Sequence, residues 1–352
     1  MRIAVIAPPW LSVPPAGYGG TENVLDTLCR GLRAAGHDVL LHASGDSTCP
    51  VERSWTCPQA VGTEHIDQVT ELRHVIDAYE AALDWGAEII HDHTLTGPFY
   101  AHHGDDVAVV TTNHGPFDRE LAPLFRALAP RVPVIAISEH HAASAGDIPI
   151  AAAIHHGIDH RRIPVGTGRG GYALFLGRMH PTKGLDTAIT AARVAGVPLR
   201  IAAKMREPAE RDYYRACVEP LLGGDIEYVG EIGGADKFAL LADATCLLNP
   251  INWPEPFGMV MIEALACGTP VVATPCGAAP EIVRDGRTGF IRPDIASLAA
   301  ALGHVDRIDR RACRAEVENR FSMARLAADH GRLFQRLKER SATARSGFRT
   351  SA

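Results

Sequence analysis

The sequence lacks the marks of a secreted, membrane-spanning or nucleic-acid-binding protein. Its eight cysteines are scattered over 352 residues without a Cys-x-x-Cys pair, so we expect reduced thiols. No run approaches the ~18 apolar residues of a spanning helix. A net charge of −6 provides no basic surface for nucleic acid. The first apolar run has no basic leader and is broken by Pro8 and Pro9, unlike a signal peptide. We therefore expect a cytoplasmic protein.

The chain instead alternates buried strands with amphipathic helices. Its composition, 46% hydrophobic and 22% charged, is that of a globular protein, and its length suits two domains. Because the strand patterns are apolar on both faces, they predict a parallel sheet covered by helices. The clearest strand–helix pairs are 2–7 with 21–35, 107–112 with 117–129, and 132–137 with 139–145.

The pattern starts again after a segment at 155–171 that is rich in Gly, His and Arg and suits an exposed linker. Strand patterns then recur from 172 onward. We predict an α/β protein with Rossmann-like domains at 1–160 and 168–320, an amphipathic helix at 321–340 and a disordered tail at 341–352. Ligands of such sheets lie beyond the carboxyl ends of the strands, which predicts binding between the two domains.

The most informative stretch surrounds two glutamates that lie eight residues apart. Glu255 lies in a proline-rich loop, Gly258 opens a helix, and Glu263 lies within that otherwise uncharged helix. The free N–H groups at a helix start favour an anion such as a sugar diphosphate. Glu255 could accept hydrogen bonds from sugar hydroxyls, and Glu263 could hold two ribose hydroxyls. The alternative is that both are solvated surface acids.

The run EPFGMVMIE, followed by ALACGTPVVA, resembles the Glu-x7-Glu signature of retaining GT-B glycosyltransferases. Nearly the whole chain resembles glycosyltransferase family 4. The resemblance implies two Rossmann-like domains facing across a cleft, with the C-terminal helix crossing back to the N-terminal domain. It also implies that Glu255 contacts the donor sugar as a catalytic residue and that Glu263 binds the ribose. Backbone near four further residues would meet sugar and phosphate: Phe257, Gly258, Met259 and Val260.

A second motif, FLGRMHPTKG, follows the first strand of the C-terminal domain. We expect the strand to end at Gly177, where the chain can bend and contact the donor. Arg178 and Lys183 would then neutralise the diphosphate and stabilise it as it leaves, which is catalysis by electrostatics. The family uses a similar Gly-Arg and Lys-Gly pair in this way. The alternative is that both are ordinary surface cations.

A glycine loop precedes the first helix and includes Gly19 and Gly20. It is not Gly-x-Gly-x-x-Gly, so NAD binding has little support. In the family a similar loop closes over the donor phosphate, although a plain flexible turn is the alternative. His114, directly after a strand, is expected to contact the donor sugar or to assist electrostatically. His91 and His93 share one face of a strand, but no third ligand is indicated, and we predict no metal site.

Two further features bear on the acceptor and the donor. The arginine-rich helix at 119–131 could meet a phosphorylated or lipid-linked acceptor, but we favour simple packing on the sheet over membrane contact. The sequence departs from the family pattern at three places. Ala203–Lys204–Met205 stands where the family often has Gly-x-Gly, and Gly277–Ala278 stands where it has Gly-Gly. His156 stands where the family frequently has an Asn. These departures affect the expected choice of donor more than the reaction class.

These features together predict a retaining, metal-independent hexosyltransferase that needs no cofactor. It would move mannose or glucose from a nucleotide-diphosphate sugar, with GDP-mannose favoured slightly over UDP-glucose and ADP-glucose behind. The acceptor would be a hydroxyl of a glycan, a small molecule or a lipid-linked sugar. The alternative is a GT-B relative that does not transfer a sugar, which would be either a sugar-nucleotide epimerase or a nucleotide-sugar-binding protein.

Overall fold

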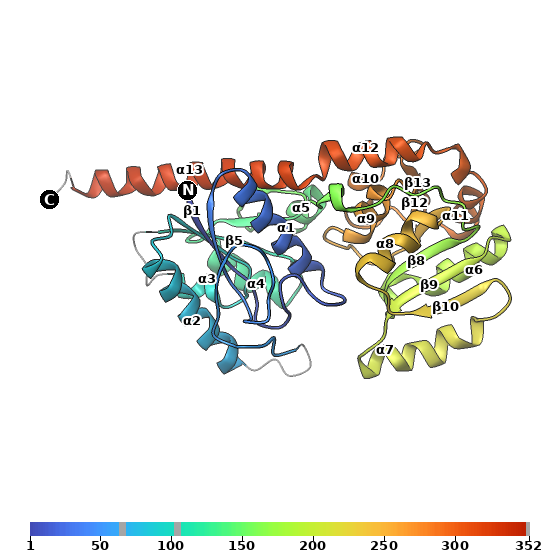
Figure 1. Cartoon of the computed structure of the whole chain (residues 1–352), viewed down its shortest axis with the longest axis horizontal. Coiled ribbons are helices and arrows are strands. Elements are labelled where there is room, and N and C mark those ends of the chain that lie inside the picture. Colours follow the sequence, from blue (N-terminus) through green and yellow to red (C-terminus); the bar gives the residue numbers. More distant parts are fainter. Residues whose placement is uncertain (63–67, 102–106, 350–352) are drawn as a thin grey trace. The chain divides into compact units, whose positions relative to one another are not determined.

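The computed structural model describes residues 1–62, 68–101 and 107–349. The chain forms two compact units (Figure 1). The N-terminal unit contains Met1–Gly157 together with the chain from Met323 onward, and the C-terminal unit contains Ile158–Ser322. Each unit is built on one parallel sheet, which confirms the predicted fold class.

The sheet of the N-terminal unit has seven described strands in the order β3-β2-β1-β4-β5-β6-β7. Its strands are β1 (Arg2–Ile6), β2 (Asp38–His42), β3 (Glu52–Ser54), β4 (Ile89–Asp92), β5 (Ala108–Thr112), β6 (Val134–Ala136) and β7 (Ile150–Ala153). The helices described in this unit are α1 (Gly20–Ala34), α2 (Gln68–Asp84), α3 (Gly97–Tyr100), α4 (Leu121–Leu128), α5 (Glu139–Ser144) and α13 (Met323–Arg349). The strand order reverses direction between β1 and β4, where open α/β sheets bind ligands.

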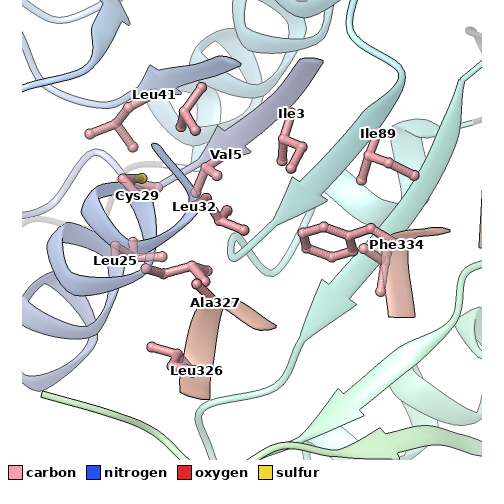
Figure 2. Close-up of a cluster of buried hydrophobic side chains, with 14 of the residues drawn as sticks. Ile3, Val5, Leu25, Cys29, Leu32, Leu41, Ile89, Leu326, Ala327 and Phe334 are labelled. Carbon is pink, nitrogen blue, oxygen red and sulfur yellow. The ribbon is translucent and has the colours of Figure 1, made fainter. Parts of the chain in front are cut away.

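The core of the N-terminal unit joins the beginning of the chain to its end (Figure 2). Leu25, Cys29 and Leu32 on α1 pack toward Val5 on β1. Leu326, Ala327 and Phe334 on α13 enter the same cluster, and each is at most 2% exposed. Since burying one large apolar side chain contributes roughly 1.5–3 kcal/mol, this apolar stripe is sufficient to hold the last helix against α1.

Helix α13 continues through residues 341–349, where the sequence predicted a disordered tail. For residues 341–346 the reason is local: the run SATARS contains neither proline nor glycine, and its alanines and arginine are good helix formers. The helix then continues past Gly347 to Arg349. The helix therefore extends beyond its packed turns. Residues 350–352 of the predicted tail lie outside the described residues.

The C-terminal unit repeats the architecture with six described strands in the order β10-β9-β8-β11-β12-β13. They are β8 (Ala173–Arg178), β9 (Leu199–Lys204), β10 (Ile226–Gly230), β11 (Cys246–Asn249), β12 (Val271–Ala273) and β13 (Gly289–Ile291). Its helices are α6 (Leu185–Ala195), α7 (Pro208–Tyr213), α8 (Gly234–Asp243), α9 (Met259–Ala266), α10 (Ala279–Ile282), α11 (Ile295–Leu302) and α12 (Arg310–Arg320). Here the strand order reverses between β8 and β11.

The segment 155–171, predicted as an exposed linker, contains the boundary between the two units and is exposed over most of 161–171. Part of it also packs closely on the C-terminal unit. Gly166 N donates to the Cys267 carbonyl, and a Cβ at Gly166 would lie 1.9 Å from the Ala242 oxygen. The Arg310 guanidinium of α12 bonds the Gly166, Ala242 and Ala244 carbonyls. Glycine and arginine in this segment and its partner helix therefore serve close backbone packing, which composition alone did not reveal.

A row of histidines crosses the interior of the N-terminal unit. His91 and His93 on and beside β4 have ring centroids 4.0 Å apart, and His330 of α13 lies 5.2 Å from His91. On the other side, His114 lies 5.1 Å from His93 and stacks on His156 at 5.3 Å. Burial, followed by the nearby imidazoles, lowers the pKa of His91, His93, His114 and His156, to about 3 for His114. Burial also lowers the pKa of His330 to about 4, and the Arg325 charge acts in the same direction.

The histidine row predicts acid-labile folding of the N-terminal unit. The rings are neutral in the folded state but titrate near pH 6.5 once unfolded, so unfolding takes up protons. The free energy of unfolding should be constant above about pH 7 and fall as the pH drops from about 6.5 toward 4. Each histidine contributes a slope of up to ~1.4 kcal/mol per pH unit.

Urea unfolding between pH 7.5 and 5 measures this slope. In the variant His330→Gln, unfolding should take up about one proton fewer, and the slope should fall accordingly. The matched control, His304→Gln, changes an exposed histidine and should leave the slope unaltered. A flat profile between pH 7 and 5 contradicts the assignment of these rings as neutral in the folded protein.

Candidate functional site

An ion pair joins two of the predicted motifs at the carboxyl edge of the C-terminal sheet. Arg178 is the last residue of β8, and Lys183 ends the following 3₁₀ turn, Pro181–Lys183. Lys183 Nζ donates to Glu255 Oε1 at 2.8 Å, and both side chains are 16% exposed. Folding therefore brings residues 72 positions apart into direct contact. The ammonium also lies 5.5 Å from the centroid of the Trp253 ring.

The bend after β8 is made by Gly184 and not by Gly177. Gly177 lies inside β8, and its φ is not positive. Gly184 has φ +69°, and a Cβ there would lie 1.9 Å from the Pro250 oxygen. The sequence prediction about Gly177 as a bend was wrong because the strand continues to Arg178. A donor contact at Gly177 stays a prediction.

The loop that carries Glu255 is fixed by close backbone packing. Gly277 has φ +59°, and a Cβ there would lie 2.3 Å from the main-chain carbonyl oxygen of Glu255, so glycine is required. Ala278 N donates to that oxygen at 3.1 Å. Within the described chain, the buried donors Asn249 Nδ2 and Trp253 Nε1 have no acceptor. Sequence reasoning did not single out either side chain, since neither belongs to a spaced acidic or basic pattern.

The start of α9 offers uncapped backbone donors beside this loop. Gly258 is the N-cap residue with φ +95°, and no side chain caps the helix. Phe257 is buried, whereas Met259 and Val260 in the first turn are half-buried. The dipole and the free N–H groups of this turn favour an anion, in line with the predicted diphosphate contacts.

Glu263, the second motif glutamate, lies in α9 and is 6% exposed. Lys237 of α8 donates to its Oε1 at 2.7 Å. The two helices are neighbours in the C-terminal unit (Figure 1). Sequence analysis missed Lys237, because its only signal is a lone lysine 26 residues before the glutamate.

Arg178 has a carboxylate partner that the sequence did not predict. Its Nε lies 3.6 Å from Glu210 Oε1, and Lys204 Nζ lies 3.2 Å from the same oxygen. Burial alone would raise the pKa of Glu210, but the backbone N–H groups of Glu207 and Arg206 and the Lys204 ammonium bring it below its usual value. Glu210 therefore stays charged. Lys204, one of the departures from the family pattern, adds a cation beside Arg178.

The N-terminal unit holds its predicted residues at the carboxyl edge of its own sheet. His93 follows β4 and His114 follows β5, and their Nδ1 and Nε2 atoms are 2.8 Å apart. In that hydrogen bond one of the two ring nitrogens carries the proton and donates it, and the other accepts. Because the pKa of His114 is lowered to about 3 by burial and then by His141 and His330, its ring is neutral near pH 7. A neutral imidazole can donate or accept a hydrogen bond but carries no positive charge.

The glycine loop ends in two residues with different surroundings. Gly19 is buried, and a Cβ there would lie 2.8 Å from Pro15 and 2.9 Å from Glu22 Oε2. Gly20 begins α1 and is exposed, with nothing within 4 Å of an added Cβ. Gly19 is therefore required by packing, while Gly20 leaves the helix start open to approach.

Helix α4 packs on the sheet, as favoured from the sequence. Phe125 and Leu128 enter a hydrophobic cluster with β6, while Arg126 forms an exposed ion pair with Asp147. No group of three or more His, Cys, Asp or Glu within the described ranges is arranged to hold a metal. In the same part of the chain, no helix combines the length and apolar character needed to cross a membrane.

Comparison with known proteins matches both units. Residues 18–162 match the family model Glycosyltransferase Family 4, and residues 170–305 match Glycosyl transferases group 1. The phosphatidyl-myo-inositol mannosyltransferase of Mycobacterium leprae (strain TN) is 27% identical over 334 residues, which cover 86% of each chain.

Solved structures share the fold. Sucrose-phosphate synthase from Thermosynechococcus elongatus superposes with a TM-score of 0.77 at 22% identity, covering 96% of this chain and 98% of that one. Anabaena HepE, in complex with UDP and glucose, gives a TM-score of 0.72 at 19% identity over 95% and 99% of the two chains. Both are GT-B-type neighbours, and at this identity they support the architecture alone. Together with the two family models, the paired Rossmann-like sheets and the Glu255–Glu263 motif, they place this chain in glycosyltransferase family 4, as a glycosyltransferase of the GT-B fold.

Proposed function

We propose that the chain is a retaining hexosyltransferase that moves mannose or glucose from a nucleoside-diphosphate sugar to an acceptor hydroxyl without a metal or another cofactor. The observation that carries the proposal is the 2.8 Å pair between Lys183 and Glu255. It puts a cation suited to phosphate beside a carboxylate suited to sugar hydroxyls, and the uncapped start of α9 follows three residues after Glu255.

The donor we favour is GDP-mannose, ahead of UDP-glucose. Support comes from the mannosyltransferases among the relatives, including the mycobacterial enzyme and, over 124 residues at 32% identity, the O-antigen chain mannosyltransferase B of Escherichia coli. The fold neighbour HepE was solved with UDP and glucose, which keeps UDP-glucose as the second choice. The acceptor class is a hydroxyl of a glycan, a small molecule or a lipid-linked sugar.

The proposed reaction is a front-side displacement. The bond from the sugar's anomeric carbon to the β-phosphate oxygen breaks, and the bond to the acceptor oxygen forms on the same face. The acceptor proton passes to the departing phosphate oxygen. Arg178, Lys183 and the N-terminus of α9 stabilise the growing phosphate charge, while Glu255 orients the sugar. These fixed charges do the work that a divalent cation would otherwise supply.

His114 acts in this scheme as a neutral hydrogen-bond partner of the donor sugar. Its bond to His93 and its stacking on His156 fix the ring, and its pKa of about 3 excludes an imidazolium near pH 7. A role as a proton-donating cation would require a pKa near the working pH.

The variant Glu255→Gln separates binding from transfer. Removing the carboxylate charge frees Lys183 for the diphosphate, so GDP or UDP should bind at least as tightly as in the wild type. Transfer should fall by about a hundredfold, as when one transition-state contact is lost. Calorimetry and a donor-consumption assay measure the two quantities.

The matched control is Glu227→Gln, which breaks the exposed Arg200–Glu227 pair of the same unit and should change neither quantity. Wild-type transfer by Glu255→Gln would refute the sugar-site assignment. Loss of nucleotide binding in that variant would mean that Glu255 holds the loop and not the sugar.

Nucleotide binding should be indifferent to metal removal. Titration of GDP, UDP and ADP with EDTA present, and again with magnesium, should give the same affinity for whichever nucleotide binds best. The reason is that Arg178, Lys183 and the helix dipole provide the positive charge. Binding that appears only with magnesium contradicts the metal-independent clamp.

A further inference from the structure

The ion pair between Lys237 and Glu263 is more than a link between two helices. Helix α8 is already joined to the end of α9 by Cys267 Sγ donating to the Phe238 carbonyl. Just beyond α9, Thr269 Oγ1 donates to the Leu241 carbonyl at 2.6 Å. A nearly buried ion pair adds little net stability, because desolvating both charges offsets their attraction. Packing alone therefore gives no reason for a charged pair here.

The geometry of the pair leaves half of the carboxylate available. Glu263 is 6% exposed, and its Oε1 accepts from Lys237 Nζ at 2.7 Å. No hydrogen bond from the described residues reaches its Oε2, and this oxygen is not among the buried polar atoms that lack a partner, so it remains open to solvent. One oxygen is therefore fixed by Lys237, while the other remains accessible to the hydroxyl donor of a ligand.

Lys237 is itself held in place. It lies in the first turn of α8, its side chain is 17% exposed, and its ammonium lies 4.8 Å from the Phe238 ring centroid. A fixed ammonium on one carboxylate oxygen sets the rotation of the carboxylate plane. It also offsets the cost of keeping that carboxylate charged in a nearly buried position.

We propose that Lys237 is a positioning residue that orients Glu263 toward the vicinal 2′- and 3′-hydroxyls of the donor's ribose. The ribose hydroxyls would donate to the carboxylate, with Oε2 as the free acceptor. The site thereby requires a ribonucleotide with both hydroxyls. This inference rests on the proposed function, because it takes the bound ligand to be a nucleoside-diphosphate sugar.

The proposal is tested by a cycle that removes the ribose hydroxyls from the ligand and the ammonium group from the protein, separately and together. Calorimetry compares GDP with 2′,3′-dideoxy-GDP on the wild type and on Lys237→Met, with the UDP pair run in parallel. The wild type should bind the ribonucleotide at least about tenfold more tightly than its dideoxy form, the usual effect of hydrogen bonds to a charged group. Lys237→Met should weaken ribonucleotide binding by about tenfold and leave dideoxynucleotide binding unchanged.

Two further variants separate positioning from general charge and folding. Lys237→Arg keeps a cation at the carboxylate and should recover most of the ribonucleotide affinity. Lys338→Met removes a lysine from the Lys338–Glu88 pair of the N-terminal unit and should have no effect. In the transfer assay, Lys237→Met should raise the donor KM while kcat changes little, because the ribose is remote from the reacting bond.

The outcomes are distinct. If Lys237→Met weakens both nucleotides equally, or neither, the positioning role is overturned while the proposed function stands. Wild-type affinity that is equal for the ribo and dideoxy forms also overturns it. If GDP, UDP and ADP all fail to bind the wild type, the proposed function falls, and this inference falls with it.

Discussion

In a parallel sheet every strand ends at the same edge, and the candidate chemistry of this protein depends on that constraint. Motifs that are 72 residues apart in the C-terminal unit meet because β8 and β11 are neighbours that end together. In the N-terminal unit, His93 and His114 meet beyond β4 and β5 for the same reason. Neither contact requires unusual side chains, since each follows from strand order and direction.

Charge is arranged differently in the two units. The C-terminal unit pairs each motif glutamate with a lysine, Lys183 with Glu255 and Lys237 with Glu263. Each pair holds a lysine ammonium and a glutamate carboxylate in a fixed position. The N-terminal unit presents neutral, buried histidines in a row. These rings are neutral hydrogen-bonding groups, whereas the C-terminal unit holds the fixed ammonium groups of Lys183 and Lys237.

The sequence predicted both sheets because strand periodicity is a local signal, and it singled out Glu255 and Glu263 by their local spacing. It failed where tertiary packing decides. The 155–171 segment is exposed over most of 161–171, as predicted, but its composition did not reveal that Gly166 bonds the Cys267 carbonyl and accepts from Arg310 of α12. The bend assigned to Gly177 belongs to Gly184, since the end of a strand is set by its neighbours. Lys237 and Glu210 carry no spacing signal, so only folding reveals them.

The central claim, metal-independent transfer with retention by a family 4 enzyme, is tested most directly by the anomer of the first product. Proton NMR would follow slow transfer of the sugar from GDP-mannose, UDP-glucose and ADP-glucose to water, in EDTA and without another acceptor. One donor should be cleaved, and the α-anomer of its sugar should appear first, before mutarotation. Initial release of the β-anomer would contradict retention, and a failure to cleave any of the three donors unless magnesium is added would contradict the metal-free clamp.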